Sequence, residues 1–580
     1  MTQNNFNWKI GGEAGYGIMS AGAMFSRAML RAGQFVFDYT EYPSLIRGGH
    51  NTYEVSVSPD PIFGVRRPIH ILVALNRATI DYQKIELSPN AIVIFNSDNT
   101  KAEASEFAKE AVVIGIPMEK LSIDSGAERV GRNTVALGAS FAACGVPFDR
   151  LKEIIELNFS LKKKDGKVAE VNIKAAKAGY EHIRQKLQNN SPFQLKIQDN
   201  PGRLLMSGND ALSWGAIKAG CNFYSGYPMT PSTSILHVFA AQAPKYSMVV
   251  KHTEDEITAI CAAIGAGYTG VRSMTATSGG GFALMVEALG MAGMVEVPLV
   301  IVESMRPGPS TGMPTWTGQE DLKFVLSASQ GEFPRVVVAP GDVEQSYQYI
   351  QQAFNIAEEF QTPVVVMMDK YLGSSHKWVN PKELKNEPIK RGMIVHEKDL
   401  KTDEPYLRYL DTVNGVSPRT LPGTKGGMHI ANSDEHNEKS FTEEDASERA
   451  RMMDKRFKKE AAIAKNLPNP ELEGEKNADL TLITWGSAKG PVQEAIHVLK
   501  LEGKKVNMLQ IVFISPFPTE KVQEVMKKAK KIAIVENNKT GQLAGWLREQ
   551  TGLAPDYKIL KYDGRPFFAH ELVETIKELL

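Results

Sequence analysis

Short apolar runs alternate along this chain with longer stretches in which apolar residues recur every three or four positions. In the first third, the runs at 71–75, 91–95 and 111–116 have the length of buried strands, and Trp8-Lys9-Ile10 opens another. Residues 18–32 have the apolar spacing of a helix. Strands that alternate with helices in this way predict a doubly wound α/β sheet.

The same alternation returns twice further along the chain. In the middle we expect strands at 221–224, 247–251, 272–277, 298–303, 335–338 and 363–368. Near the end we expect strands at 480–484, 506–511, 532–535 and 558–560, with helices at 490–502 and 518–529. Because 580 residues exceed what one hydrophobic core supports, the sequence predicts an α/β protein of three α/β domains.

Two stretches interrupt this alternation. Residues 188–202 carry Asn and Pro at both ends and indicate a linker, whereas residues 377–476 are polar and charged with one expected helix near 446–465. An irregular stretch of that length is uncommon inside a compact fold, so we expect it to wrap over another surface or a partner. The predicted division is a first domain at 1–187, the linker at 188–202, a second domain at 203–376, the wrapping segment at 377–476 and a third domain at 477–580.

Charge and cysteine content narrow the function classes. Lys plus Arg and Asp plus Glu both number 67, and this balance argues against a nucleic-acid-binding protein, which would carry a basic excess. Cys144, Cys221 and Cys261 lie far apart and form no Cys-x-x-Cys pair, so thiolates of this chain cannot build a zinc or iron–sulfur site. We expect all three to be buried, reduced thiols.

No feature of the sequence indicates a membrane or an export signal. Residues 1–7 are polar, and the longest apolar run, 283–302, is interrupted by Glu287 and Glu296. We therefore expect a cytoplasmic protein with no membrane or nucleic-acid partner. His429, Asp434, Glu435 and His436 match no metal-ligand spacing, and we predict no metal site in this chain.

A glycine-rich segment, Gly11-Gly12-Glu13-Ala14-Gly15-Tyr16-Gly17, follows the first predicted strand. It matches neither a P-loop nor a clean Gly-x-Gly-x-x-Gly pattern. It is either a tight strand-to-helix turn or a site for phosphate at the next helix N-terminus. Arg47-Gly48-Gly49-His50 is a second candidate anion contact, and its alternative is a polar turn.

Residues 225–235 form the most informative stretch. Pro228 and Pro231 fix their φ angles, so the segment between them is a stiff turn that can present the Thr230 hydroxyl to a ligand. The alternative is a loop that only joins a strand to a helix.

The next segment, Thr253-Glu254-Asp255-Glu256, precedes an apolar helix of small residues. It can be a capping box in which Thr253 caps the helix and Glu256 reaches back. Otherwise, burial holds the Glu256 carboxyl partly protonated at the mouth of that helix.

Two further segments follow predicted strands, where α/β sheets bind ligands. Thr275-Ala-Thr-Ser-Gly-Gly-Gly281 indicates a glycine turn before a helix at 282–291, either a plain turn or a place where a flat ring approaches the backbone. Arg306-Pro-Gly-Pro-Ser-Thr-Gly-Met-Pro-Thr315 combines an arginine with hydroxyl groups and suits carboxylate capture. Its alternative is an Arg306 that pairs with Glu303.

Together these motifs resemble a known family. Tyr227-Pro-Met-Thr-Pro231, Glu256, the 275–281 segment and the 306–315 segment are similar to the alpha subunit of 2-oxoacid:ferredoxin oxidoreductases. The glycine-rich segment and Arg47-Gly-Gly resemble that family's gamma subunit, fused ahead of alpha. Val535–Leu543 and Tyr562-Asp-Gly-Arg-Pro566 resemble its transketolase-C-terminal-like domain.

The resemblance implies a gamma-type domain, a thiamine-diphosphate pyrimidine-binding domain and a transketolase-C-terminal-like domain. The family oxidatively decarboxylates a 2-oxo acid with coenzyme A and thiamine diphosphate, and it reduces ferredoxin. By position, Glu256 would hydrogen-bond the aminopyrimidine ring and Thr230 would touch the substrate, as the catalytic residues. Cofactor-binding residues would be Tyr227, Pro228, Glu256, Thr277, Ser278 and Gly279. Substrate-binding residues would be Thr230, Arg306, Ser310, Thr311 and Thr315.

The chain departs from the family pattern in three ways. Pro307 stands where the family often has glycine, the first glycine segment lacks a glutamine common in gamma subunits, and no Gly-Asp-Gly segment is followed by Asn-Asn. Gly341-Asp342-Val343 is a poor substitute for the last motif. The resemblance therefore implies a separate beta subunit that brings diphosphate binding, Mg and a 4Fe–4S cluster, in a heterodimer or a dimer of heterodimers with the active site at the interface.

Within this family we expect 2-oxoglutarate as the substrate, in either reaction direction, because the arginine and hydroxyl groups of the 306–315 segment suit a dicarboxylate; branched-chain 2-oxo acids and pyruvate are the alternatives. Two other classes stay open from the residues: a non-catalytic nucleotide-binding assembly subunit, and a thiamine enzyme of the transketolase or synthase type.

Overall fold

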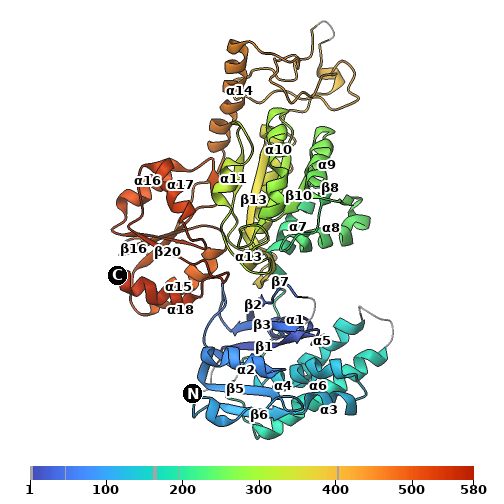
Figure 1. Cartoon of the computed structure of the whole chain (residues 1–580), viewed down its shortest axis with the longest axis vertical. Helices are drawn as coiled ribbons and strands as arrows, with labels where there is room; N and C mark the ends of the chain where they lie inside the picture. Colours follow the sequence, from blue (N-terminus) through green and yellow to red (C-terminus); the bar gives the residue numbers. More distant parts are fainter. Residues whose placement is uncertain (1–3, 46–47, 161–165, 194, 402–403) are drawn as a thin grey trace.

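The computed structural model describes residues 4–45, 48–160, 166–193, 195–401 and 404–580, and within these residues the chain forms three sheets. Figure 1 shows a first unit at the bottom, a second in the middle and a third beside it. The α/β class and the three α/β parts that the sequence predicts are confirmed. The domain boundaries stay a prediction.

The first sheet has the strand order β6-β5-β4-β1-β3-β2-β14-β7. Strands β1, β4, β5 and β6 run parallel, whereas β3, β2, β14 and β7 pair antiparallel, so the sheet is mixed and the doubly wound prediction is wrong for this half. Its strands are β1 Phe6–Ala14, β2 Phe35–Glu41, β3 Gly48–Ser58, β4 Ile69–Ala74, β5 Leu87–Asn96, β6 Val112–Ile116, β7 Leu204–Ser207 and β14 His376–Val379. Its helices are α1 Ile18–Arg31, α2 Arg77–Gln83, α3 Met118–Asp124, α4 Arg132–Ala143, α5 Phe148–Ser160 and α6 Gly166–Lys186.

The glycine-rich segment is mostly strand. Residues 11–14 continue β1, and the turn into α1 is made by Gly15, Tyr16 and Gly17, with Gly15 and Gly17 at positive φ. Such backbone favours glycine for steric reasons alone, so the turn interpretation is sufficient here. The second candidate anion contact falls partly outside the described residues, because Arg47 is among those not described, and Gly48–His50 open β3.

The second sheet has the order β18-β12-β13-β11-β10-β8-β9, in which all neighbours run parallel except β18. Its strands are β8 Phe223–Gly226, β9 Val249–His252, β10 Ser273–Thr277, β11 Leu299–Met305, β12 Val336–Val338, β13 Pro363–Asp369 and β18 Phe513–Ser515. Its helices are α7 Gly208–Lys218, α8 Thr233–Tyr246, α9 Glu256–Tyr268, α10 Gly279–Met294, α11 Leu322–Ser327, α12 Val343–Phe360 and α13 Lys370–Ser374. Runs such as 299–302 and 364–366 are buried on both sides, which explains their continuous apolar character.

The third sheet has the order β15-β17-β16-β19-β20. Its strands are β15 Leu472–Gly474, β16 Leu480–Thr484, β17 Val506–Gln510, β19 Ile532–Glu536 and β20 Tyr557–Leu560. Its helices are α15 Lys489–Leu501, α16 Thr519–Lys528, α17 Gln542–Thr551 and α18 Ala569–Leu579. Strand β18 lies in the third unit's part of the sequence but pairs with β12 of the second sheet. The two units also share one hydrophobic core.

Residues 380–401 and 404–471 lie against the second unit and contain α14 Ala446–Ala464, the helix expected near 446–465, at its far end (Figure 1). Buried ion pairs fasten this segment. Lys455 Nζ lies 2.5 Å from Glu296 Oε1, and Lys459 pairs with the other oxygen of the same carboxylate. Arg419 lies 3.0 Å from the buried Glu358, which also binds Arg272, the residue before β10. The surface that the segment covers thus belongs to the same chain.

The three cysteines do not share one environment. Cys144 and Cys221 are buried as predicted, but Cys261 is exposed. It lies on α9, and the prediction of three buried thiols is wrong for this residue. Among the described residues, none of the helices has both the length and the apolar composition that a membrane span requires.

Candidate active site

The carboxyl edge of the second sheet gathers the segments that the sequence singled out. Neighbouring parallel strands β11, β10, β8 and β9 end at the same edge. Thr230 follows β8, Glu256 follows β9, Ser278 follows β10 and Arg306 follows β11. Crossover connections of this kind place ligand-binding loops together whatever their separation in sequence.

Glu256 is the first residue of α9, and the helix is capped by Asp255 instead of Thr253. The Asp255 carboxylate accepts a hydrogen bond from the Thr258 N–H at 2.7 Å, so the capping-box prediction is wrong. The Glu256 side chain is therefore free of a capping role. It is buried, and its Oε1 has no hydrogen-bond partner in the part of the chain that the structure describes. Burial raises the pKa of this carboxyl, and the neighbouring Asp255 adds to the effect.

The triple glycine is the first turn of α10, not a turn before it, so the helix begins three residues earlier than predicted. A β-carbon on Gly281 would lie 2.0 Å from Thr277 Oγ1 and 2.6 Å from Glu256 Oε1. Glycine is therefore required for the Glu256 carboxyl and the Thr277 hydroxyl to rest against the start of α10. Ser278 precedes the helix, and its buried hydroxyl also has no hydrogen-bond partner among the described residues.

Arg306 and Thr230 are in direct contact. Arg306 Nη1 donates to the backbone oxygen of Thr230 at 2.7 Å, which joins the loop after β11 to the turn after β8. No ion pair links Arg306 to Glu303 in the described structure, so that alternative is wrong. Pro228 and Thr230 are half-buried and Tyr227 is exposed.

The hydroxyl groups of the 306–315 loop separate into two environments. Ser310 and Thr311 are exposed. Thr315 is buried, and its hydroxyl donates to the backbone oxygen of Tyr42 in the first unit at 2.5 Å. Thr315 thus holds the loop to another unit, whereas Ser310 and Thr311 remain available to a ligand.

Sequence reasoning missed a pair of carboxyl groups, Glu303 and Asp321. Glu303 is fully buried opposite Thr277 in the β10–β11 ladder, and burial together with Asp321 raises its pKa. Burial raises the pKa of Asp321 to about 6. A β-carbon on Gly279 would lie 2.4 Å from Asp321 Oδ2, so this carboxyl also packs on the start of α10. The sequence signal that could have revealed this pair was Glu303, a glutamate at the end of an otherwise apolar strand.

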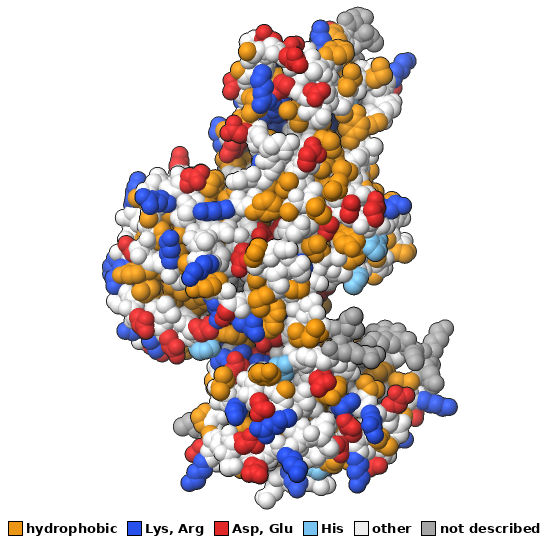
Figure 2. All heavy atoms as spheres, viewed as in Figure 1, with side chains coloured by type: hydrophobic (Ala, Val, Ile, Leu, Met, Phe, Trp, Pro, Cys, Tyr) orange, Lys and Arg blue, Asp and Glu red, His pale blue; other side chains and the backbone are white. Residues whose placement is uncertain are grey.

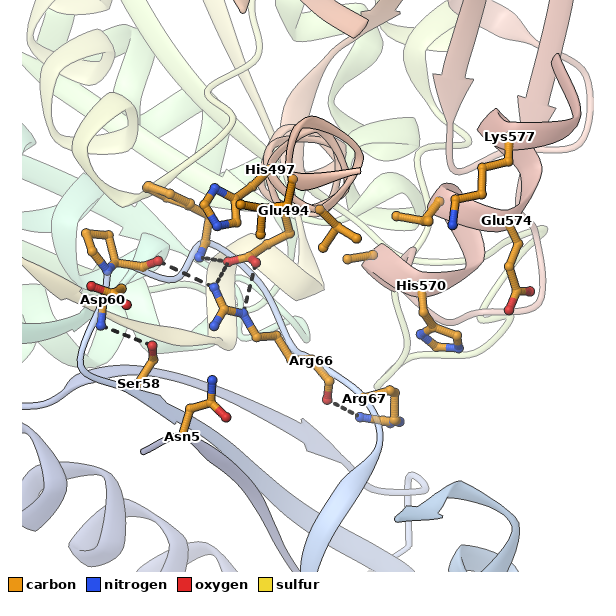
Figure 3. Close-up of a pocket in the computed structure, with 16 residues that line it drawn as sticks. Asn5, Ser58, Asp60, Arg66, Arg67, Glu494, His497, His570, Glu574 and Lys577 are labelled. Carbon is orange, nitrogen blue, oxygen red and sulfur yellow. Dashed lines mark hydrogen bonds and ion pairs between the residues drawn. The ribbon is translucent and has the colours of Figure 1, made fainter. Parts of the chain in front are cut away.

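A separate cleft of about 900 Å³ lies between the first and third units (Figure 3). It is lined by none of the predicted site residues. Its central charges neutralise each other, because Arg66 Nε lies 2.9 Å from the buried Glu494 carboxylate. Among the described residues no cluster of three His, Cys, Asp or Glu could hold a metal ion, and Glu435 of the 429–436 segment binds Arg456 instead.

Family models match most of the chain. Residues 7–182 match "Pyruvate ferredoxin/flavodoxin oxidoreductase", residues 214–455 match "Pyruvate flavodoxin/ferredoxin oxidoreductase, thiamine diP-bdg", and residues 478–562 match "Pyruvate:ferredoxin oxidoreductase core domain II". These ranges fall on the first, second and third units in turn.

Individual proteins match over nearly the full length. The chain is 33% identical to the 2-oxoacid:ferredoxin oxidoreductase subunit alpha of Saccharolobus solfataricus, over 99% of this chain and 98% of that protein. It is 29% identical to the 2-oxoglutarate oxidoreductase subunit KorA of Mycobacterium tuberculosis, over 99% and 91%. The solved 2-oxoglutarate:ferredoxin oxidoreductase from Magnetococcus marinus, with 2-oxoglutarate, coenzyme A and succinyl-CoA bound, is 31% identical with a TM-score of 0.91 over 99% of each chain.

The raised pKa of Asp321 predicts a pH-dependent stability. A folded-state pKa of about 6 above an ordinary value of 3.8 means that the native state holds this proton more tightly. That contribution is complete below pH 3.8 and is lost as pH rises through 6. Asparagine cannot ionise. The melting temperature of Asp321→Asn relative to that of the unmodified chain should therefore rise from pH 4.5 to pH 7.5, whereas that of Asp124→Asn, at an exposed position, should not. If the melting temperatures of Asp321→Asn and the unmodified chain differed by the same amount at pH 4.5 and at pH 7.5, Asp321 would ionise normally.

Proposed function

Because the chain belongs to the family of 2-oxoacid:ferredoxin oxidoreductase alpha subunits, we propose that, with its partner subunits, it acts on 2-oxoglutarate. The reaction is coenzyme A-dependent oxidative decarboxylation to succinyl-CoA and carbon dioxide with reduction of ferredoxin, or the reverse. The names of the KorA relative and of the Magnetococcus structure support this substrate. The observation that carries the proposal is the buried Glu256 carboxyl at the carboxyl edge of the second sheet, whose Oε1 has no hydrogen-bond partner among the described residues.

The residues at this edge fit thiamine diphosphate. Glu256 Oε1 and Ser278 Oγ are buried polar atoms that the described residues leave without partners, and a bound ring with polar edges would satisfy them. Glu256 would hold the aminopyrimidine ring, and Tyr227, Pro228, Thr277, Ser278 and Gly279 would surround it. When bound, this cofactor supplies the electron sink that allows a 2-oxo acid to lose carbon dioxide.

The role proposed for Glu256 requires its protonated form. Burial raises the pKa of this carboxyl and so favours its protonated form, which can donate a hydrogen bond to a ring nitrogen. An ionised glutamate could only accept. The absence of a β-carbon at Gly281 leaves room for Glu256 Oε1, which a β-carbon there would meet at 2.6 Å.

Arg306 is the residue best placed to bind the acid. One of its amino groups donates to the Thr230 carbonyl, which fixes the guanidinium, and no hydrogen bond to another described residue occupies its remaining N–H groups, which can bind a carboxylate. Thr230 would lie beside the keto group, with Ser310 and Thr311 at the outer side of the site. 2-Oxoglutarate carries a second carboxylate that pyruvate and branched-chain 2-oxo acids lack.

The diphosphate site belongs, in this proposal, to a beta subunit. Asp342 of Gly341-Asp342-Val343 is occupied otherwise, because it caps α12 through the Gln345 N–H at 2.8 Å and pairs with Lys489. With no metal-ligand cluster in the described residues and no cluster-binding cysteines in the sequence, Mg and the 4Fe–4S cluster would come with that subunit.

The partner would cover the outer surfaces of α9, α10 and α11, which we call the α9–α10 face: Ile257, Cys261, Leu284 and Phe324. Ile257 is 47% exposed and Leu284 51%, although charged residues in α9 and α10 are limited to Glu256 and Glu287. Figure 2 shows hydrophobic side chains exposed along the middle of the molecule, where Figure 1 draws these helices. Helices that are apolar on all sides are normally buried, so this face indicates a protein interface.

Glu256→Gln should lower kcat at least about 100-fold while the complex stays assembled, because glutamine cannot supply the carboxyl proton. The matched control is Glu254→Gln, two residues earlier and exposed, which should retain activity. Turnover is followed as coenzyme A-dependent viologen reduction under anaerobic conditions. Activity of Glu256→Gln within a few-fold of the unmodified enzyme would refute the assigned role.

The same assay tests the substrate. The complex purified with its native partner is offered 2-oxoglutarate, pyruvate and a branched-chain 2-oxo acid. We expect the highest kcat/KM with 2-oxoglutarate, by about tenfold or more, since one extra carboxylate–guanidinium contact is worth about that factor. A higher kcat/KM for pyruvate or the branched-chain acid would make that acid the substrate. No viologen reduction with any of the three acids would contradict the proposed reaction.

Leu284→Asp should prevent partner binding, because a charge placed in the α9–α10 face would be buried without a counter-ion. The control is Leu501→Asp on α15, which is 77% exposed and lies in the third unit. Co-purification of a tagged chain with the partner measures assembly. Equal recovery of partner with both variants would place the interface elsewhere.

A further inference from the structure

The motif Tyr562-Asp563-Gly564-Arg565-Pro566 has no role in the site described above, yet it packs on the loop that carries Arg306. The Gly564 backbone oxygen accepts a hydrogen bond from the Thr317 N–H at 3.1 Å. The Arg565 backbone oxygen accepts another from Asn537 Nδ2 at 3.0 Å, which fixes the motif within the third unit. The motif and the loop come from different sheets, so this contact is made only in the assembled fold.

The Arg565 side chain makes two contacts at once. Its Cζ lies 3.4 Å from the centroid of the Trp316 ring, and its Nε lies 3.1 Å from Glu41 Oε1 at the end of β2. A guanidinium is flat and permanently charged, so it can stack on an indole with its face while its edge binds a carboxylate. A lysine ammonium cannot do both in this geometry.

Two backbone hydrogen bonds connect Trp316 to the residue that follows Arg306. The Trp316 N–H donates to the Met313 oxygen at 3.1 Å, and the Met313 N–H donates to the Pro307 oxygen at 2.9 Å. Pro307 follows Arg306 directly. The loop is thus folded back on its own base, and a displacement of Trp316 would be transmitted to Arg306.

The first unit holds the other side of the same loop. Thr315 donates to the Tyr42 oxygen, and Tyr42 follows Glu41, the residue that Arg565 binds. Residues 41–42 of the first unit, 315–316 of the second and 565 of the third therefore meet at one junction. The Arg565 side chain contacts both of the other units there.

We propose that Arg565, Trp316 and Glu41 are positioning residues for Arg306: the stack and ion pair set the place of the 306–316 loop and hence of the guanidinium that binds the 2-oxo acid. This inference rests on the proposed role of Arg306 in substrate binding. A contact that merely joined the units would alter stability or assembly and leave the affinity for the acid unchanged.

The test variant is Arg565→Lys, which keeps the charge but loses the stack. KM for the 2-oxo acid should rise about tenfold with kcat within about twofold, the size of one lost cation–aromatic contact. Trp316→Ala should behave in the same way, and Trp316→Phe, which keeps an aromatic face, should restore most of the affinity. The matched control is Lys539→Ala, because Lys539 also lies over an aromatic ring, Tyr562 at 4.2 Å, but does not touch the loop.

A second measurement needs no substrate and separates this inference from the proposed reaction. Hydrogen exchange of the backbone amides at 306–320 in the assembled complex should be about tenfold faster in Arg565→Lys and unchanged in Lys539→Ala. Unchanged exchange in Arg565→Lys, or an unchanged KM in an enzyme that turns over, would overturn the positioning role. Loss of turnover in the unmodified complex would refute the proposed reaction, and the exchange experiment would still decide the role of Arg565.

Discussion

The contact between the Glu256 carboxyl and Gly281 is the constraint on which the site depends. Any side chain at position 281 would meet Glu256 Oε1 and Thr277 Oγ1 at distances shorter than atoms can approach. The contact requires α9 to start at Glu256 and α10 to start at Gly279. The first requirement is met because Asp255, not Glu256, caps α9, and the second because α10 begins directly after Ser278. The Asp321 carboxyl packs against Gly279 at the start of the same helix, so two carboxyl groups lie at the N-terminus of α10.

Much of this arrangement could be predicted from the sequence. The central strands of the second sheet were found because both of their faces are buried, which makes them continuous apolar runs. The segments around Thr230, Glu256, Ser278 and Arg306 were expected to meet because parallel strands end at a common edge. Local chemistry was harder: Thr253 and Asp255 are both good caps, and the choice between them depends on backbone geometry that composition does not record.

What the sequence could not show are contacts between residues far apart in the chain. Arg565 and Glu41 are polar residues in separate units, and neither neighbourhood indicates a partner for the other. Glu303 was considered only as a partner for Arg306, whereas the fold places it against Asp321. The exposure of Cys261 was missed for a related reason, since an α9 that is apolar on every side gives no sign of which face meets the sheet.

The pairing of β7 with β14 has a consequence for how this chain could be divided. These strands flank the second unit in sequence, pair with each other from Leu204 to Ser207, and reach the first sheet where Lys377 meets Phe37 of β2. If the chain were cut in the 188–202 stretch, the two-stranded ribbon would stay with the larger fragment, and the edge of β2 would become its docking site. Reassociation of the fragments would then proceed as strand addition, with main-chain hydrogen bonds supplying much of the recognition.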